Sequence, residues 1–144
     1  MNLVIDSNIV ISSLVTPKGA VARLMLYELA GSNLYCPTFL HEEIIGKIPK
    51  IQKVTQLDKE QVYSLIDMLV KQLEFFDEAL IDEPIMQQAY QLVKDIDKKD
   101  VLFVALSLQM NLPLWTGDKA LVEGLAGKGF TNTISTREIY NKFL

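Results

Sequence analysis

Short apolar runs alternate with longer amphipathic segments along the chain. The apolar runs predict five buried strands, at 2–5, 33–36, 73–77, 112–116 and 130–134. Apolar residues at helical spacing predict helices between or after them, at 19–31, 57–73, 83–96, 119–129 and 135–144. A further helix is expected after the second strand, and another over the almost wholly apolar run 101–110. Strands that alternate with helices predict a parallel, doubly wound α/β sheet with helices on both faces.

Residues at the ends of these segments support the helix assignments. Asp58 with Gln61, and Ser135 with Glu138, have the spacing of a capping box. Pro84 stands at a position that favours the start of a helix. No Pro-, Gly- or Ser-rich linker divides the chain, so residues 1–144 are expected to form a single domain.

The composition is that of an ordinary globular protein, with 49% hydrophobic and 22% charged residues. The amino terminus lacks the basic start of a signal peptide and carries Asp6 within its apolar run. The longest apolar run, 101–110, is too short to span a bilayer, so we expect no membrane segment and a cytoplasmic location. Cys36 follows a predicted strand and is expected to be a buried thiol.

The net charge of −4 argues against broad, sequence-independent binding of nucleic acid, which depends on Lys and Arg. It does not exclude a nucleic-acid enzyme whose acids are gathered in one metal site. A local basic rim remains available from Lys47, Lys50, Lys53, Lys98, Lys99 and Lys119.

Acidic residues gather at one edge of the predicted sheet, outside the carboxyl ends of the strands, where ligands bind in open α/β folds. They follow strands or lie near the starts of helices: Asp6, Glu42, Glu43, Asp97, Asp100 and Asp118. Taken alone, each has a simple explanation, as a helix N-cap for the aspartates or a solvated helix face for the glutamates. Periodicity does not choose between Glu42 and Glu43, and it places the neighbouring His41 closer to the apolar side, where a core histidine is expected.

Taken together, the acids indicate a site for a cation. Two unit charges ~4 Å apart repel by roughly 4 kcal/mol at an effective dielectric constant of about 20. Four such groups would not stay ionised together unaided: either their pKa values rise sharply or a cation neutralises them. Oxygen ligands without a neighbouring Cys or His favour Mg²⁺ or Mn²⁺ over zinc. Such ions support hydrolysis of phosphodiesters, and no hydroxyl group in the chain has the base partner that a protein nucleophile needs.

Four segments resemble the motifs of the PIN-domain ribonucleases, in the same order and at similar separations. They are VIDSNIVIS, PTFLHEEI, DIDKKDVLFVALSL and PLWTGDKAL, and the last is similar to a subgroup with Leu-Trp-Thr-x-Asp-Lys near its end. The resemblance runs from residue 2 to about residue 138 and so covers nearly the whole chain. It implies a three-layer α/β/α fold around a mainly parallel sheet of about five strands.

The resemblance also implies a function and a set of site residues. It implies a Mg²⁺- or Mn²⁺-dependent endoribonuclease, in many members the toxin of a toxin–antitoxin pair, held inactive by a small antitoxin and often a homodimer. The metal-binding and catalytic carboxylates would be Asp6, Glu43, Asp100 and Asp118. Asp97 would be an outer metal ligand, with Glu42 as the alternative to Glu43. The polar residues beside the metal would be Ser7, Asn8 and Thr116.

Two other functions compete with this interpretation. A PIN-like module could bind RNA or a protein without cutting, although such a module has no reason to keep a costly cluster of like charges. A phosphohydrolase could use Asp6 as its nucleophile, but the acid that one such family carries two residues later is replaced by Asn8. No phosphate-binding loop of the GxxxxGK type occurs in the sequence.

Overall fold

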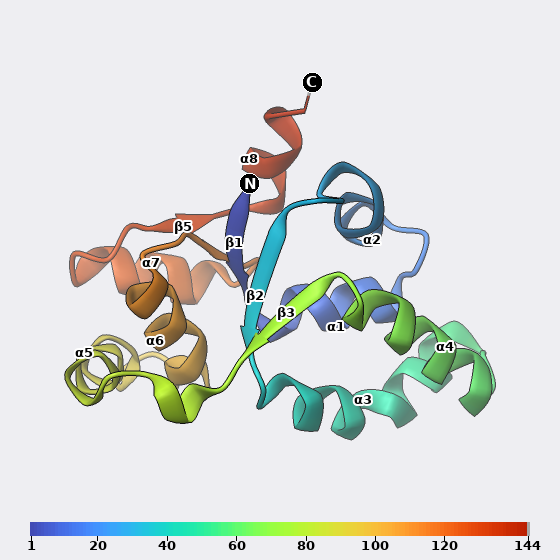
Figure 1. Cartoon of the computed structure of the whole chain (residues 1–144), viewed down its shortest axis with the longest axis horizontal. Helices are drawn as coiled ribbons and strands as arrows, with labels where there is room; N and C mark the ends of the chain where they lie inside the picture. Colours follow the sequence, from blue (N-terminus) through green and yellow to red (C-terminus); the bar gives the residue numbers. More distant parts are fainter. Residues whose placement is uncertain (144) are drawn as a thin grey trace.

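Five parallel strands form one sheet in the computed structural model, which describes residues 1–143 (Figure 1). Their order across the sheet is β3-β2-β1-β4-β5. The strands are β1 (Asn2–Ile5), β2 (Asn33–Pro37), β3 (Leu73–Phe76), β4 (Leu114–Trp115) and β5 (Thr133–Ile134). The predicted parallel sheet of about five strands is confirmed, and the last two strands are shorter than their apolar runs.

Helices cover both faces of this sheet. They are α1 (Ser7–Val15), α2 (Ala20–Arg23), α3 (Leu40–Thr55), α4 (Lys59–Val70), α5 (Glu83–Val93), α6 (Val101–Met110), α7 (Lys119–Gly127) and α8 (Thr136–Asn141). A π-helical turn, η1 (Leu24–Glu28), and two 3₁₀ turns, η2 (Glu78–Leu80) and η3 (Lys98–Asp100), complete the order. Helices α1 to α4 lie to one side of the sheet and α5 to α7 to the other, which gives the expected three layers (Figure 1).

The predicted capping boxes are both present. The backbone N–H of Gln61 donates to Asp58 Oδ1 (2.8 Å) at the start of α4, and that of Glu138 donates to Ser135 Oγ (3.1 Å) at the start of α8. The last residue of the helix predicted at 135–144 lies outside the described residues. Helix α1 is an element that the sequence pattern did not predict.

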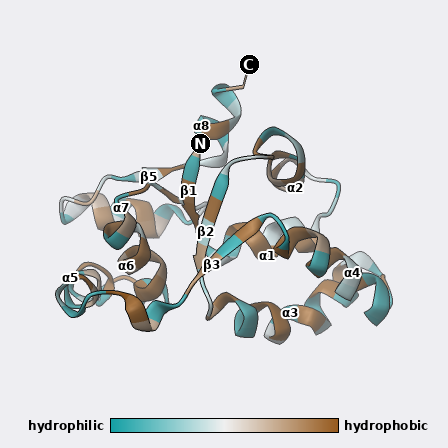
Figure 2. Cartoon of the chain, in the orientation of Figure 1, coloured by the Kyte–Doolittle hydropathy of each residue, from teal (hydrophilic) through white to brown (hydrophobic). Residues whose placement is uncertain are grey.

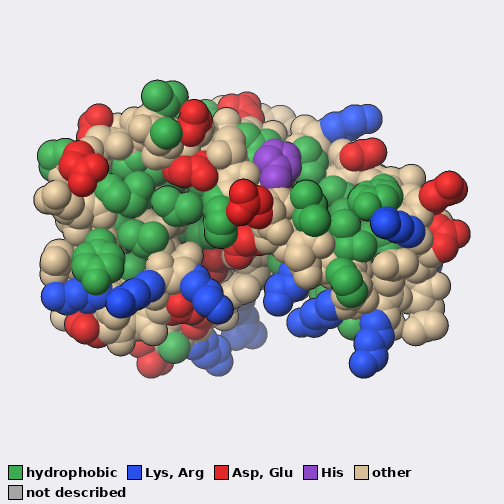
Figure 3. Space-filling model, turned by 90° about the horizontal axis from the view of Figure 1, so that it is seen from below, with side chains coloured by type: hydrophobic (Ala, Val, Ile, Leu, Met, Phe, Trp, Pro, Cys, Tyr) green, Lys and Arg blue, Asp and Glu red, His purple; other side chains and the backbone are tan. Residues whose placement is uncertain are grey.

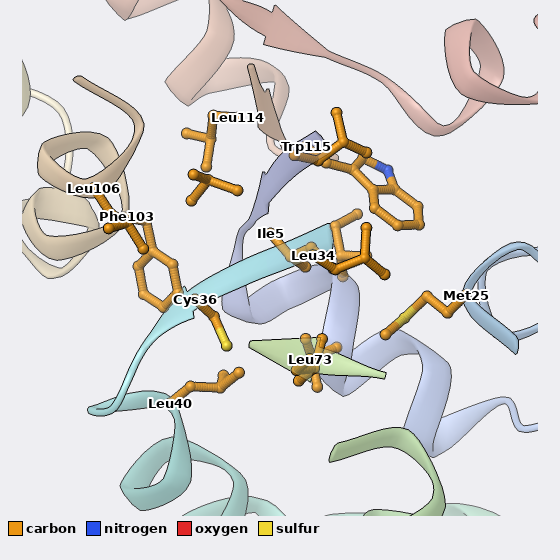
Figure 4. Close-up of a cluster of buried hydrophobic side chains, with 14 of the residues drawn as sticks. Ile5, Met25, Leu34, Cys36, Leu40, Leu73, Phe103, Leu106, Leu114 and Trp115 are labelled. Atoms are coloured by element: carbon orange, nitrogen blue, oxygen red, sulfur yellow. The ribbon is translucent and has the colours of Figure 1, made fainter. Parts of the chain in front are cut away.

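The apolar helix α6 lies against the middle of the sheet. It contacts β1, β2 and β4, and Figure 2 shows it mostly in the brown of hydrophobic residues. Figure 4 shows Phe103 and Leu106 of this helix among the buried side chains of the strands, with Cys36 beside them as expected. Burial raises the pKa of the Cys36 thiol to about 12, so this thiol stays protonated.

The sheet also fixes where a ligand can approach. The chain moves outward from β1 through β2 to β3, then crosses back to place β4 on the other side of β1. The crevice between the ends of β1 and β4 is therefore the topological switch point, where open α/β sheets bind ligands. Among residues 1–143, no single helix is long and apolar enough to cross a membrane. Helix α1 and the segment Ala20–Glu28 together have the length and composition of a span, but as a pair bent by 107°.

Candidate active site

Asp6 and Thr116 meet at the switch point, one residue beyond the ends of β1 and β4. The backbone N–H of Asp6 donates to the carbonyl of Trp115 (3.0 Å), which continues the pairing of the two strands. The Thr116 hydroxyl donates to Asp6 Oδ2 (2.8 Å) and accepts from the backbone N–H of Asp118 (3.1 Å). Thr116 therefore links the Asp6 carboxylate to the backbone of Asp118 and fixes the orientation of Asp6.

Asp6 is almost fully buried, with 1% of its surface exposed. Burial raises the pKa of its carboxyl group, and the charge of Asp118 adds to that rise. The hydrogen bond from Thr116 and the backbone N–H groups of Ser7 and Asn8 act in the opposite direction. Ser7 is itself buried at the start of α1, whereas Asn8 is exposed there.

Asp100 reaches the same place from the start of α6. Its side chain is 8% exposed, and its pKa is raised to about 7, first by burial and then by the charges of Asp6, Asp97, Asp118 and Glu43. All these acids therefore lie within electrostatic reach of Asp100. A carboxyl group with this pKa exchanges its proton close to neutral pH, where a cation can take the proton's place.

The structure distinguishes between the two glutamates that periodicity left open. Glu43 is half-buried in the first turn of α3, and burial raises its pKa, with Asp6 adding to the rise and Ser7 opposing it. Lys47 and Lys99 also lower this pKa, so both ammonium groups lie close enough to act on Glu43. Glu42 is exposed.

Helix capping explains only part of the acidic set. Asp97 accepts from the backbone N–H of Lys99 (2.9 Å), and Asp118 from that of Leu121 (3.1 Å). Asp97 is exposed and caps the 3₁₀ turn η3 that precedes α6, one turn earlier than expected. Asp6 and Asp100 precede α1 and α6 without making a side-chain cap bond. Capping therefore does not account for the two most buried carboxylates.

Three carboxylate oxygens in this cluster are buried and have no hydrogen-bond partner in the part of the chain that the structure describes: Asp6 Oδ1, Glu43 Oε1 and Asp100 Oδ2. Buried oxygens of this kind are costly unless a donor or a cation satisfies them. Within residues 1–143, no three Asp, Glu, His or Cys side chains are already arranged to hold an ion. The donors fit a hard, oxygen-seeking cation.

His41 does not lie in the core, and that prediction was wrong. The residue is exposed, and its imidazole ring stacks on Phe75 of β3 with centroids 3.9 Å apart and planes 20° apart. Phe75 had no place in the site predicted from the sequence. In the sequence, Phe75 is only one of two adjacent aromatic residues in the strand predicted at 73–77.

A family model described as the PIN domain matches residues 4–140 of the chain. The chain belongs to the PIN-domain family. Members of this family are typically nucleases and generally use divalent metal ions. Whether this chain belongs to the subgroup marked by the Leu-Trp-Thr motif stays a prediction.

A solved structure has the same fold: the crystal structure of VapBC2 from Rickettsia felis, bound to a DNA fragment from its promoter. The match has a TM-score of 0.67 and covers 94% of this chain and 97% of that chain, at 16% sequence identity. At this identity the match supports the fold alone. No curated protein matches the chain significantly.

Proposed function

We propose that this PIN domain is a metal-dependent endoribonuclease that hydrolyses phosphodiester bonds in RNA. The observation that carries the proposal is the set of three unpaired, buried carboxylate oxygens on Asp6, Glu43 and Asp100. Three segments far apart in the sequence deliver them to the switch point of the sheet. Buried carboxylate oxygens that lack a hydrogen-bond donor are expected where a bound group satisfies them. Mg²⁺ or Mn²⁺ suits a site made only of carboxylates.

The proposal assigns a role to each residue of the cluster. Asp6, Glu43, Asp100 and Asp118 would hold one or two ions, with Asp97 at the outer edge. When bound, such ions activate water for attack and neutralise charge on the scissile phosphate. Thr116 keeps Asp6 in position, since its hydroxyl donates to Oδ2 and leaves Oδ1 free. Ser7 lies beside Glu43, whose pKa it lowers, and so favours the ionised form that binds metal.

The same proposal includes a toxin–antitoxin role. Its support is the shared fold with VapBC2, a toxin–antitoxin complex, together with the family motifs in the sequence. A small antitoxin protein would bind this chain and hold it inactive. A homodimer and a cytoplasmic location are the further expectations that follow from this role.

The direct test is to incubate a panel of RNAs with the purified protein, with Mg²⁺ or Mn²⁺ and with EDTA. We expect cleavage only when the metal is present. Asp100→Asn keeps the size of the side chain but removes a ligand charge. Since loss of residues that merely support a ligand costs about 10- to 100-fold, we expect this variant to lose more than about 100-fold in rate.

Asp67→Asn is the matched control, because Asp67 is an exposed acid on α4. It should cleave as the wild type does. Metal-dependent cleavage that survives substitution of both Asp6 and Asp100 would falsify the proposal. If the protein neither cuts RNA nor binds Mn²⁺ at millimolar concentration, the non-catalytic module becomes the better account.

A further inference from the structure

The stacked pair of His41 and Phe75 is an aromatic surface that the carboxylate cluster does not use. Phe75 covers one face of the imidazole ring, with centroids 3.9 Å apart. His41 is nevertheless exposed. The opposite face of the ring is therefore the part that a planar ligand can reach. Phe75 is half-buried, so the packing around its ring helps to fix the position of the histidine ring stacked on it.

This pair lies at the same edge of the sheet as the carboxylates. In the register of β2 and β3, Phe75 pairs with Cys36, one residue before the end of either strand. His41 follows in the first turn of α3, two residues before Glu43. Figure 3 views this side of the molecule and shows the histidine in purple next to red acidic side chains, with blue Lys and Arg side chains on both sides.

A second aromatic side chain stands at the start of α3. Phe39 occupies the N-cap position, makes no side-chain cap bond and is 37% exposed. Ser, Thr, Asp or Asn at this position would satisfy a backbone N–H and stabilise the helix by about 1 kcal/mol. Phe39 thus adds a second, partly exposed aromatic ring at the start of α3.

We propose that His41, supported by Phe75, is a stacking platform for one unpaired base of the RNA whose phosphate lies at the carboxylate cluster. This inference rests on the proposed function and names a subsite of the same site. Bases of single-stranded RNA stack on exposed aromatic rings, and His is among the side chains that serve. Lys47 and Lys99, the two cations that act on Glu43, are placed to neutralise the flanking phosphates. These cations favour RNA over a protein ligand.

The test measures binding separately from cutting. Fluorescence anisotropy with a labelled, short single-stranded RNA gives the Kd, in the Asp100→Asn background so that the RNA stays intact. His41→Ala should raise the Kd by about 5- to 150-fold, which is the range for one stacked base. His41→Phe keeps an aromatic ring on Phe75 and should bind close to the parent protein.

An abasic scan identifies the stacked base. Each nucleotide of the RNA is replaced in turn by an abasic one. At one position, and there alone, the parent protein should lose affinity by the same factor as His41→Ala. His41→Ala should lose nothing further with that RNA, because the two changes remove the same contact.

Tyr27→Ala is the matched control, since Tyr27 is an aromatic residue with 71% exposure in η1, and it should leave the Kd unchanged. Circular dichroism checks that His41→Ala stays folded. An unchanged Kd for His41→Ala, or an equal loss on every abasic RNA, overturns the platform. In the first case a protein partner becomes the better candidate for this surface.

The two proposals fail in different ways. A wild-type protein that cuts RNA with metal, but is indifferent to His41→Ala, refutes the platform and keeps the nuclease. A protein that binds RNA through His41 without cutting it refutes the nuclease and keeps the platform. A protein that neither binds nor cuts RNA overturns both.

Discussion

Asp97 and Asp100 lie three residues apart and have opposite environments. Asp97 is exposed and uses its carboxylate to cap η3, whereas Asp100 is buried with one oxygen unpaired. We expect Asp97→Asn to keep the fold, because Asn caps as well as Asp does. Cleavage should fall by about 10- to 100-fold, as for an outer supporting residue, compared with the loss of more than about 100-fold expected for Asp100→Asn.

Asp97→Ala separates the charge from the cap. It should lower the free energy of unfolding by about 1 kcal/mol through loss of the cap, which urea denaturation can measure. Relative cleavage rates of Asp97→Asn and Asp100→Asn, measured in the same metal buffer, decide the division of roles. If Asp97→Asn is the more damaging of the two, the roles are reversed.

Single residues show how far the sequence could predict this site. The acids at the strand ends were identifiable because strands that alternate with helices run parallel, so their carboxyl ends share one edge of the sheet. Glu43 could be preferred over Glu42 only through the family motif, since the choice depends on how α3 is rotated against α1. His41 was assigned to the wrong environment for a related reason. Helical periodicity predicts which face of α3 is apolar, but tertiary packing decides which residues contact each side chain. Here the partner is the ring of Phe75 on an edge strand.

At the scale of elements, four helices point their N-termini at the acidic cluster. Helices α1, α6 and α7 begin directly after Asp6, Asp100 and Asp118, and Glu43 lies in the first turn of α3. The positive ends of these helices stabilise nearby anions by about 0.3–1 kcal/mol each. They oppose the burial and the charge repulsion that raise the pKa values of the Asp6, Glu43 and Asp100 carboxyl groups, and they also favour an incoming phosphate.

Helix α1 escaped prediction because Asp6 alone separates it from β1. Only the short polar stretch Asp6, Ser7 and Asn8 divides the run from Asn2 to Val15, and a short apolar run cannot be assigned to strand or helix from its periodicity. The same one-residue connection brings Ser7 and the first N–H groups of α1 directly to the Asp6 carboxylate. The short connection that made α1 hard to predict therefore also positions the residues of the site.

Gly124 sets the approach of α7 to the segment that carries Asp97 and Asp100. A Cβ at this position would lie 2.5 Å from Ile96 Cδ1 and 2.8 Å from Ile96 Cγ1. Overpacking of this kind costs about 1–3 kcal/mol, more than the gain of about 1 kcal/mol from Ala in a helix. We therefore expect Gly124→Ala to lower the free energy of unfolding by about 1 kcal/mol in urea denaturation.

Gly46→Ala is the matched substitution, since Gly46 is also helical but a Cβ there would meet nothing within 4 Å. It should raise the free energy of unfolding by about 0.5–1 kcal/mol through helix propensity alone. Adding Ile96→Ala to Gly124→Ala should remove the clash, leaving a loss smaller than the sum of the single changes. Equal effects of Gly124→Ala and Gly46→Ala would show that α7 is not held against Ile96.

At the scale of the whole molecule, alternating elements predicted a parallel sheet, but not the order of its strands. That order depends on which side of β1 the chain returns to after β3, and this is decided by packing of α5 and α6 on the second face. The return places β4 beside β1 and so creates the switch point. Without this order, Asp6 and Asp118 would be strand-end acids with no reason to meet.

Concentrating acids at this point links the stability of the whole chain to pH. The pKa of Asp100 rises from its ordinary value of 3.8 to about 7 on folding, and those of Asp6 and Glu43 also rise. A raised pKa means that the folded state binds the proton more tightly than the unfolded state does. The stabilisation from the protonated Asp100 is thus complete below about pH 4 and is lost as the pH rises to about 7.

We therefore predict that the thermal midpoint in EDTA falls between about pH 5 and about pH 8. Mn²⁺ should reverse this fall, because it binds the ionised carboxylates of the folded state alone. A concentration of about 100 times its Kd adds about 2.7 kcal/mol to the free energy of unfolding. The metal-induced rise should be larger at about pH 8 than at about pH 5, where protons compete for the same oxygens.

Differential scanning fluorimetry at both pH values, with EDTA or with Mn²⁺, measures the four midpoints. Asp100→Asn should flatten the fall with pH and weaken the response to metal, while Asp67→Asn should follow the wild type. An equal metal-induced rise at the two pH values, in wild type and Asp100→Asn alike, would mean that Mn²⁺ binds somewhere other than these carboxylates. The pH dependence and the metal response should change together, since both arise from the same unpaired oxygens at the end of β1 and the start of α6.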